Sequence, residues 1–233
     1  MKKLTVVIPV FNEEKTIEAI VQKVLSTKLL NNIRKEIILI DDFSNDKSRE
    51  IISKIVKNNN DCKSFLKDFN SGKGASIHKG IEMASGDYLI VQDADLEYDP
   101  GEYNKLIKPV LSVKADVVYG SRFNGSDPHR ILFFWHTIGN KFLTFLSNMF
   151  NNLNLTDMET CYKLIKLDLL KSMNLKEKRF GFEPEITAKL SKVKNIKIYE
   201  VGISYYGRTY QEGKKINWRD GFRAIYCIIK YGL

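Results

Sequence analysis

The run Tyr88-Leu89-Ile90-Val91-Gln92-Asp93-Ala94-Asp95-Leu96-Glu97 joins four apolar residues to three carboxylates. Its apolar part has the length and composition of a buried β-strand. Two aspartates two positions apart, directly after such a strand, can both reach one hard divalent cation through oxygen. A cation held there can bridge a diphosphate and neutralise the charge on a leaving nucleotide. A bare Asp-x-Asp pair is more often a solvated acidic turn, but its place after a strand favours the metal site.

The same order, an apolar run followed by polar residues, recurs along the first 120 residues. Apolar runs occur at residues 4–10, 36–41, 63–68, 87–92 and 115–120, and helical patterns at 13–28, 46–56 and 72–84. Short strands that alternate with helices predict an α/β fold with a mostly parallel central sheet and helices on both faces. Ligands of such sheets bind at the carboxyl ends of the strands. Asp41 and Asp42, which end one run, are therefore expected near Asp93 and Asp95.

The pattern changes after Ser121. A loop containing Arg130 leads to an aromatic-rich helical stretch at residues 131–150, and a basic loop at 206–215 leads to a terminal helix. Between them lie a short strand near residues 162–165, two helices and a strand near 197–203. Because no repeat or low-complexity linker separates these parts, we expect one domain, residues 1–233, with a C-terminal elaboration.

Composition limits the compartment and the partners. The chain has 233 residues, of which 43% are hydrophobic, enough for one sizeable core, and its formal net charge is +9. A basic surface suits an anionic partner: nucleic acid, an acidic membrane or a phosphorylated substrate. Cys62, Cys161 and Cys227 lack zinc-ligand spacing and imply no disulfide framework, which fits a reduced cytosolic compartment. No apolar run reaches the length of about 18 residues that predicts a transmembrane helix.

Two further segments carry polar groups suited to a nucleotide. Asp41 or Asp42 could accept hydrogen bonds from a base or a ribose hydroxyl, or could cap the following helix in competition with Ser44. Asn70-Ser71-Gly72-Lys73-Gly74 precedes a helical pattern, and glycine followed by lysine at a helix start suits a phosphate. Its spacing is neither that of a P-loop nor that of G-x-G-x-x-G, so this segment alone is a weak signal.

Six segments, taken together and in order, resemble the family 2 glycosyltransferases and, within that family, the polyprenyl- and dolichyl-phosphate sugar synthases. The matching segments are Val6–Glu14, Ile40–Ser44, Asn70–Gly74, Gln92–Glu97, Gly120–Phe123 and Thr156–Lys163. The resemblance covers nearly the whole chain and implies a GT-A fold, which is Rossmann-like. It also implies an inverting transfer of a sugar from GDP-mannose or a UDP-sugar to polyprenyl or dolichyl phosphate. Residues 1–120 would form the nucleotide-sugar-binding half, and residues 121–233 the acceptor- and membrane-facing half.

The resemblance, together with the arguments above, assigns the donor site. Asp93 and Asp95, with Glu97 as a third contact, would hold Mg²⁺ or Mn²⁺ against the donor diphosphate. The family often has Gln in place of Glu97, which is a departure in this chain. The residues expected to contact the donor nucleotide are Pro9, Phe11, Glu13, Asp41, Asp42, Lys73, Asp93, Arg208 and Lys214.

A lipid phosphate acceptor makes chemical sense for these residues. A phosphate monoester has a second pKa of about 6 by analogy with phosphoserine, so it arrives mostly ionised and needs no base. The enzyme then has to hold two anions together, which a metal ion and arginines can do by electrostatic preorganisation. Arg122 and Arg130 match the positions that hold phosphate in the lipid-phosphate synthases. Asp95, Arg122 and Asp157 are expected to carry catalysis, with Asp157 as the base if one is used and a structural turn carboxylate as the equal alternative.

The aromatic stretch at residues 131–150 bears on location. Its aromatic residues include Phe133, Phe134, Trp135, Phe142, Phe145 and Phe150, and it has few charges. It could be an ordinary core helix or an interfacial helix beside lipid head groups, and the terminal helix from Trp218 could pack on the core or join that surface. Because the chain ends without a membrane span, we expect a cytoplasmic enzyme associated peripherally with the inner face of the membrane, and no nucleic-acid partner.

Three other functions are open to such a sequence. Another family 2 enzyme could add sugar to a saccharide hydroxyl in cell-surface polysaccharide synthesis, or to a protein hydroxyl, without needing Arg122, Arg130 and the aromatic helix. A nucleic-acid-binding module would explain the charge but not Asp93 and Asp95. A sugar-nucleotide nucleotidyltransferase has a similar alternating architecture, yet it would carry a Gly-rich, Arg-containing loop where residues 9–14 read Pro-Val-Phe-Asn-Glu-Glu.

Overall fold

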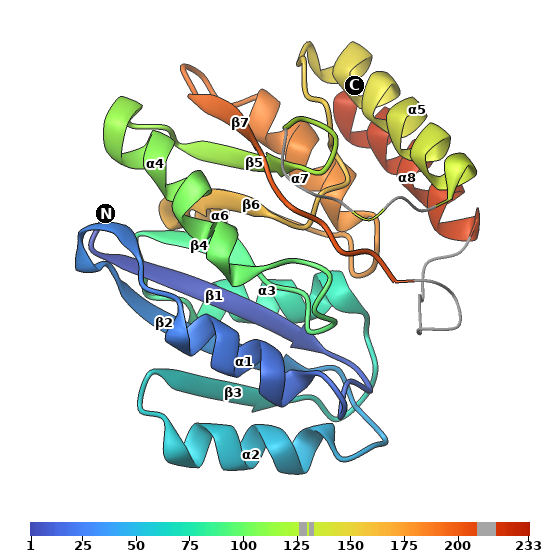
Figure 1. The fold of residues 1–233 in the computed structure, drawn as a ribbon. Coiled ribbons are helices and arrows are strands. Elements are labelled where there is room, and N and C mark those ends of the chain that lie inside the picture. The colour runs from blue at the N-terminus through green and yellow to red at the C-terminus, as the bar shows by residue number, and fades with distance from the viewer. Residues whose placement is uncertain (126–129, 131–132, 209–217) are drawn as a thin grey trace.

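Seven strands form one sheet in the order β3-β2-β1-β4-β6-β5-β7 (Figure 1). This computed structural model describes residues 1–125, 130, 133–208 and 218–233. The strands are β1 (Lys3–Val10), β2 (Arg34–Asp41), β3 (Cys62–Leu66), β4 (Tyr88–Val91), β5 (Val117–Ser121), β6 (Lys163–Lys166) and β7 (Ile198–Gly202). Neighbouring strands are parallel except where β6 pairs with β4 and β5. The predicted α/β fold with a mostly parallel sheet is confirmed.

Helices cover both faces of this sheet (Figure 1). Their bounds are α1 (Ile17–Ser26), α2 (Ser48–Asn58), α3 (Lys73–Met83), α4 (Tyr103–Val113), α5 (Phe134–Asn151), α6 (Leu167–Ser172), α7 (Phe182–Ser191) and α8 (Trp218–Gly232). Single 3-10 turns occur at Leu30–Asn32 and Pro100–Glu102. Helix α4 was not predicted, although Tyr103, Leu106, Ile107 and Val110 are buried at helical spacing. That spacing was the available signal.

The core lies on both sides of β1 and β2, which explains why their sequences are continuous apolar runs rather than alternating ones. Val6, Val7 and Ile8 in β1 are fully buried, as are the four residues Ile37–Ile40 in β2. Full burial of one such side chain contributes about 1.5–3 kcal/mol. Strands β1 and β2 therefore supply much of the stability of the half of the chain that precedes β5.

One edge of the sheet collects the loops that carry the predicted site. Val10 pairs with Asp41, and Val7 pairs with Val91, so β1, β2 and β4 end at the same edge. Strand β6 runs the other way between β4 and β5, and its first residue, Lys163, therefore lies at the edge where those strands finish. The loop before β6 therefore lies at the same edge of the sheet as the loops after β1, β2, β4 and β5.

Helices α5 and α8 lie side by side at the far end of the molecule (Figure 1). On α5 the side chains of Trp135 and Phe145 are 78% and 65% exposed, and on α8 Phe222 is 67% exposed. Other exposed apolar residues on these helices are Phe134, Ile138, Phe142, Met149, Tyr226 and Ile229. The core-helix alternative is thus wrong for this face of α5. No helix among the described residues has the length and apolar character needed to cross a membrane.

Candidate active site

Hydrogen bonds tie the loop after β1 to the loop after β2. The Asn12 N–H donates to Ser44 Oγ at 3.0 Å, and the Glu13 N–H donates to Ser48 Oγ at 3.0 Å. Ser44 therefore acts as an acceptor for the neighbouring loop, whereas the sequence had suggested a helix cap. The fixed segment contains the predicted nucleoside-pocket residues Pro9, Phe11 and Glu13.

Asp41 and Asp42 both bind neighbouring protein groups. Asp41 is fully buried, and its carboxylate accepts hydrogen bonds from amides of its own turn and from Arg49 Nε at 2.7 Å. Asp42 accepts hydrogen bonds from the N–H groups of Ser71 at 3.0 Å and Gly72 at 2.7 Å. Asp41 thus shapes the turn after β2, and Asp42 joins that turn to the start of α3.

The start of α3 lies close to the backbone at residues 177–178. A Cβ at Gly72 or Gly74 would come within 2.5 Å of a carbonyl oxygen there, and Gly72 has a φ of +98°. The two glycines place Lys73 so that its Nζ lies 2.6 Å from Asp93 Oδ1. Burial lowers the pKa of Lys73, but attraction to Asp93 contributes to a net shift well above the ordinary value. The predicted lysine and the first predicted metal ligand are therefore in direct contact.

Arg208 gathers three of the predicted acidic residues. Its guanidinium nitrogens lie 2.9 Å from Asp95 Oδ2, 3.2 Å from Glu97 Oε1 and 3.7 Å from Glu13 Oε2. Glu13 follows β1, Asp95 and Glu97 follow β4, and the arginine follows β7, so one cation joins three loops that are distant in sequence. Lys214, which was predicted to act with Arg208, lies outside the described residues.

The acidic loop, residues 92–98 after β4, holds more negative charge than Lys73 and Arg208 neutralise. Burial raises the pKa of Asp95 to about 7, and repulsion from Asp93 and Glu97 adds to the rise while Arg208 opposes it. A carboxylate whose pKa is raised by burial and like charges gains from a further cation. The carboxylate oxygens of Asp93 and Asp95 are hard donors of the kind that Mg²⁺ and Mn²⁺ accept, so the residues fit a divalent ion.

Glu97 is turned toward the protein. Its Oε2 accepts a hydrogen bond from Tyr205 OH at 2.5 Å, and its Oε1 accepts one from the Arg208 N–H at 3.0 Å. In the described ranges no group of three or more His, Cys, Asp or Glu side chains is arranged to hold a metal ion. The structure therefore brings Asp93 and Asp95 together as a pair and gives Glu97 a structural partner instead; its part in metal binding stays a prediction.

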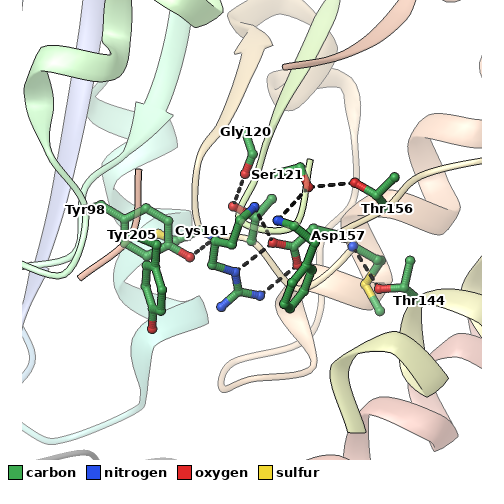
Figure 2. A network of polar contacts seen from close by, with 12 residues as sticks. Tyr98, Gly120, Ser121, Thr144, Thr156, Asp157, Cys161 and Tyr205 are labelled. Carbon is green, nitrogen blue, oxygen red and sulfur yellow. Dashed lines mark hydrogen bonds and ion pairs between the residues drawn. The ribbon is translucent and has the colours of Figure 1, made fainter. Parts of the chain in front are cut away.

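Arg122 and Asp157 form a buried ion pair beside the acidic loop. The Arg122 Nε and Nη2 atoms each lie 2.7 Å from a different oxygen of Asp157, which is fully buried (Figure 2). The guanidinium also lies 5.3 Å from the centre of the Tyr205 ring. Figure 2 shows Tyr98 and Tyr205 on one side of this pair and Thr156 on the other. Because Arg122 occupies both of its oxygens, Asp157 anchors the arginine, and its role as a base stays a prediction.

Arg130 lies along the same segment as Tyr205. Its N–H donates to Tyr205 O at 3.1 Å, and its Nη1 donates to Gly207 O at 3.2 Å. Arg122 and Arg130 are therefore brought to one short stretch of chain, residues 205–207, although they come from different parts of the sequence.

Sequence reasoning missed two residues near the acidic loop and Arg122. Tyr205 links the acidic loop to the arginine, since its hydroxyl reaches Glu97 and its ring lies under Arg122. Glu159 lies in the loop before β6 with one buried carboxylate oxygen that no described residue bonds. For Tyr205 the sequence offered no motif. For Glu159 the signal was a second acidic residue two positions after Asp157.

Comparisons with known proteins agree with this geometry. The family described as Glycosyl transferase family 2 matches residues 5–173. An uncharacterized protein of Methanocaldococcus jannaschii is 29% identical over 97% of this chain and 91% of its own length. The undecaprenyl-phosphate 4-deoxy-4-formamido-L-arabinose transferase of Photorhabdus laumondii is 34% identical over 54% of this chain. The matched part is 39% of that transferase, so the chain spans well under half of its length.

Solved structures show the same fold. Glucosyl-3-phosphoglycerate synthase from Mycobacterium tuberculosis, solved with Mn²⁺, uridine diphosphate and phosphoglyceric acid, superposes with a TM-score of 0.75. That likeness covers 99% of this chain and 78% of the synthase at 17% sequence identity, so it establishes the GT-A-like architecture alone. Since the family match extends over more than half of the chain, from β1 through α6, this protein belongs to glycosyl transferase family 2 and is a glycosyltransferase.

Proposed function

We propose that this glycosyltransferase moves a sugar, with inversion, from a nucleotide-sugar donor to the phosphate of a polyprenyl or dolichyl lipid, using Mg²⁺ or Mn²⁺. The observation that carries the proposal is that an acidic site and a basic site lie at the same edge of the sheet and are joined by Tyr205. Asp93 and Asp95 offer carboxylates to a cation, and Arg122, held rigidly by Asp157, offers a buried guanidinium to an anion. Tyr205 contacts both sides.

The donor side has the parts that a nucleoside diphosphate needs. Pro9, Phe11 and Glu13 line the β1 side, and Asp42, with its turn supported by Asp41, lines the β2 side. The metal ion, when bound by Asp93 and Asp95, would neutralise the leaving diphosphate. Lys73 and Arg208, which now contact these aspartates, carry the positive charges that can move to diphosphate oxygens. Manganese and uridine diphosphate in the M. tuberculosis synthase support the same ligands here.

The acceptor side favours a phosphate. A guanidinium locked by a bidentate carboxylate loses little entropy on binding and presents its remaining N–H groups in a fixed direction. Arg130, which is hydrogen-bonded to the backbone of residues 205–207, adds a second cation. An ionised phosphate is already a nucleophile, so Asp157 can serve as the anchor of Arg122 without acting as a base. The undecaprenyl-phosphate acceptor named for the P. laumondii transferase supports this class of substrate.

The exposed face of α5 and α8 supports peripheral binding to the cytoplasmic face of a membrane. Its apolar side chains are of the kind that enter the head-group region. In the part of these helices whose side chains are described, the exposed charged residues are Lys141, Arg223 and Lys230, all of them cationic. Cations beside an apolar stripe suit an anionic lipid surface, which is where a lipid phosphate would be found.

A direct assay tests this function. The protein is incubated with Mn²⁺, radiolabelled UDP- and GDP-sugars in turn, and a short polyprenyl phosphate, with the matching polyprenol and simple saccharides as control acceptors. We expect label to enter the organic phase only with the lipid phosphate, and EDTA to abolish the transfer. Transfer to saccharides with none to any lipid phosphate would favour the polysaccharide alternative and reject the proposal.

A further inference from the structure

Glu159 differs from its neighbours in the loop before β6. Residues 157–163 are all buried except Glu159, which is half-buried. The loop is held on both sides: Thr160 Oγ1 donates to Gly120 O at 2.6 Å, at the end of β5, and the Cys161 N–H donates to Tyr98 OH at 3.1 Å, in the acidic loop. Within residues 157–163, Glu159 is therefore the one position with partial access to solvent. It lies between the acidic loop and the end of β5.

The protein around Glu159 does not satisfy the hydrogen-bonding capacity of its carboxyl group. Its Oε1 is buried and receives no hydrogen bond from any described residue. Nearly all buried polar atoms in native proteins have a partner, because an unpaired one is costly. The structure thus leaves one oxygen of Glu159 without a protein partner among the described residues, in a carboxyl that lies within electrostatic reach of Arg122.

The charges around Glu159 favour its neutral form. Burial raises its pKa to about 7, repulsion from Glu183 and Asp157 adds to the rise, and Lys163 and Arg122 oppose it. Glu183 is itself paired with Lys163, so that cation is already shared. At neutral pH a large fraction of Glu159 thus carries a proton, and a protonated carboxyl is a hydrogen-bond donor. A neutral carboxyl kept as a donor in this way is a known catalytic device.

We propose that the Glu159 carboxyl donates a hydrogen bond to the acceptor phosphate beside Arg122, and so makes the site selective for a phosphate over a sugar hydroxyl. The inference rests on the proposed lipid-phosphate transfer. No proton is transferred: the O–H group stays on Glu159, and the phosphate oxygen opposite it attacks the sugar carbon as the bond to the donor diphosphate breaks. An ionised Glu159 would instead repel the phosphate.

Replacement by glutamine separates a donor from a base, because the amide donates a hydrogen bond but cannot ionise or accept a proton. We expect Glu159→Gln to keep kcat and the acceptor KM within about threefold of wild type at pH 7. The wild type is expected to lose activity above about pH 7 as Glu159 ionises, and Glu159→Gln is expected to lack this fall. Glu159→Ala should raise the KM for polyprenyl phosphate by about tenfold and leave the donor KM unchanged, as for loss of one hydrogen bond to an anion.

Three outcomes overturn the inference. A loss of about 100-fold in kcat for Glu159→Gln with an unchanged acceptor KM would show that the residue acts as a base on a hydroxyl. Normal acceptor KM and pH profile in both variants, while the wild type transfers to polyprenyl phosphate, would remove Glu159 from the site and leave the proposed function intact. Transfer by the wild type to saccharides alone would instead reject the proposed function itself.

Two further variants protect the test against a folding defect. Glu82→Gln, an exposed glutamate paired with Lys79 on α3, makes the same chemical change away from the proposed acceptor site and should leave the profile unchanged. Glu183→Gln removes the like charge that raises the pKa of Glu159 most, so the alkaline fall in activity should move to lower pH. If thermal melting shows that Glu159→Ala is unfolded at the assay temperature, Glu159→Gln and Glu183→Gln still test the proposal. If neither variant alters the pH dependence of activity, the proposal is contradicted.

Discussion

Carboxylates with shifted pKa values lie at both edges of the sheet, and the protein surrounds them differently at the two edges. At the amino ends of β1 and β2, Glu36 is 3% exposed and accepts hydrogen bonds from the Ser85 N–H and from Lys63 Nζ, each at 2.9 Å. Burial raises the pKa of Glu36, but these and neighbouring bonds outweigh burial and bring the pKa to about 2. At the carboxyl ends, Asp95 and Glu159 have pKa values of about 7 because burial is not matched in this way.

The number of hydrogen-bond donors around a carboxylate thus distinguishes carboxylates that stabilise the fold from carboxylates suited to binding a ligand. Where the protein supplies its own donors, the ionised form is stabilised and contributes to folding. Where the protein supplies too few donors, the ionised carboxylate lowers the stability of the fold, but it can bind a cation or another ligand more strongly. Functional sites commonly show this exchange. Removing a carboxylate should therefore damage folding at the first edge and activity at the second.

The largest effect is expected for Asp95→Asn. Loss of a metal ligand should reduce transfer by about 10³-fold. Because the pKa of Asp95 is raised in the folded state, its ionisation destabilises the fold as pH rises from its ordinary pKa to about 7. The unfolding free energy of the variant at pH 8, measured with urea, should thus be no lower than that of the wild type. Full activity with Mn²⁺ would contradict the metal site.

Glu36→Gln should show the opposite pattern. A lowered pKa stabilises the fold above the ordinary pKa, and this stability disappears as pH falls toward about 2. The variant should lose about 3 kcal/mol of unfolding free energy at pH 7, and the difference from wild type should shrink at pH 3. The kcat of the folded protein should be unchanged. A loss of kcat without a loss of stability would contradict the view that carboxylates at this edge serve folding and those at the other edge serve activity.

The third prediction concerns two Arg–Asp pairs. Arg122→Lys removes the bidentate contact with Asp157 and should raise the acceptor KM by roughly 30-fold, equivalent to about 2 kcal/mol. Arg49→Lys disturbs the corresponding pair with Asp41 after β2 and should lower the melting temperature while the acceptor KM stays at the wild-type value. Steady-state kinetics with varied polyprenyl phosphate measures both. Equal effects on the acceptor KM would mean that Arg122 has no special role.

The smallest effect is expected at the α5 surface. Phe142→Ser with Phe145→Ser should weaken binding to vesicles containing anionic lipid by about tenfold, since each aromatic side chain contributes only part of its full burial energy at an interface. Val113→Ser, an exposed apolar residue at the end of α4, is the matched control and should bind as the wild type does. Co-sedimentation at two salt concentrations measures the change. Undiminished binding by the double variant would place the membrane contact elsewhere.

Local pattern was enough to predict the first half of the fold. The runs around Ile8, Ile38 and Ile90 are apolar on both faces, so parallel strands and their shared carboxyl edge followed directly. The acidic pairs at the ends of these runs were visible for the same reason. Helix α4 was not predicted although its apolar residues are at helical spacing; Pro109, which lies inside it, is a residue that usually argues against a helix interior.

Contacts between distant segments could not be predicted in this way. Arg208 meets Asp95 across 113 residues of sequence, and Arg122 meets Asp157 only because β6 inserts between β4 and β5. The bonds made by Tyr205 depend on the same arrangement. The position of the aromatic helix was also open, since periodicity alone does not tell a core helix from one that lies on a surface.

The reversed direction of β6 has a consequence for the choice of acceptor. A strand that ran parallel to its neighbours would begin at the opposite edge, and the segment at residues 156–162 would then lie far from the leaving group. Because β6 is reversed, that short segment lies beside the loops after β4 and β5. Under the proposed function, substitutions in this one loop would alter the choice of acceptor without rebuilding the sheet.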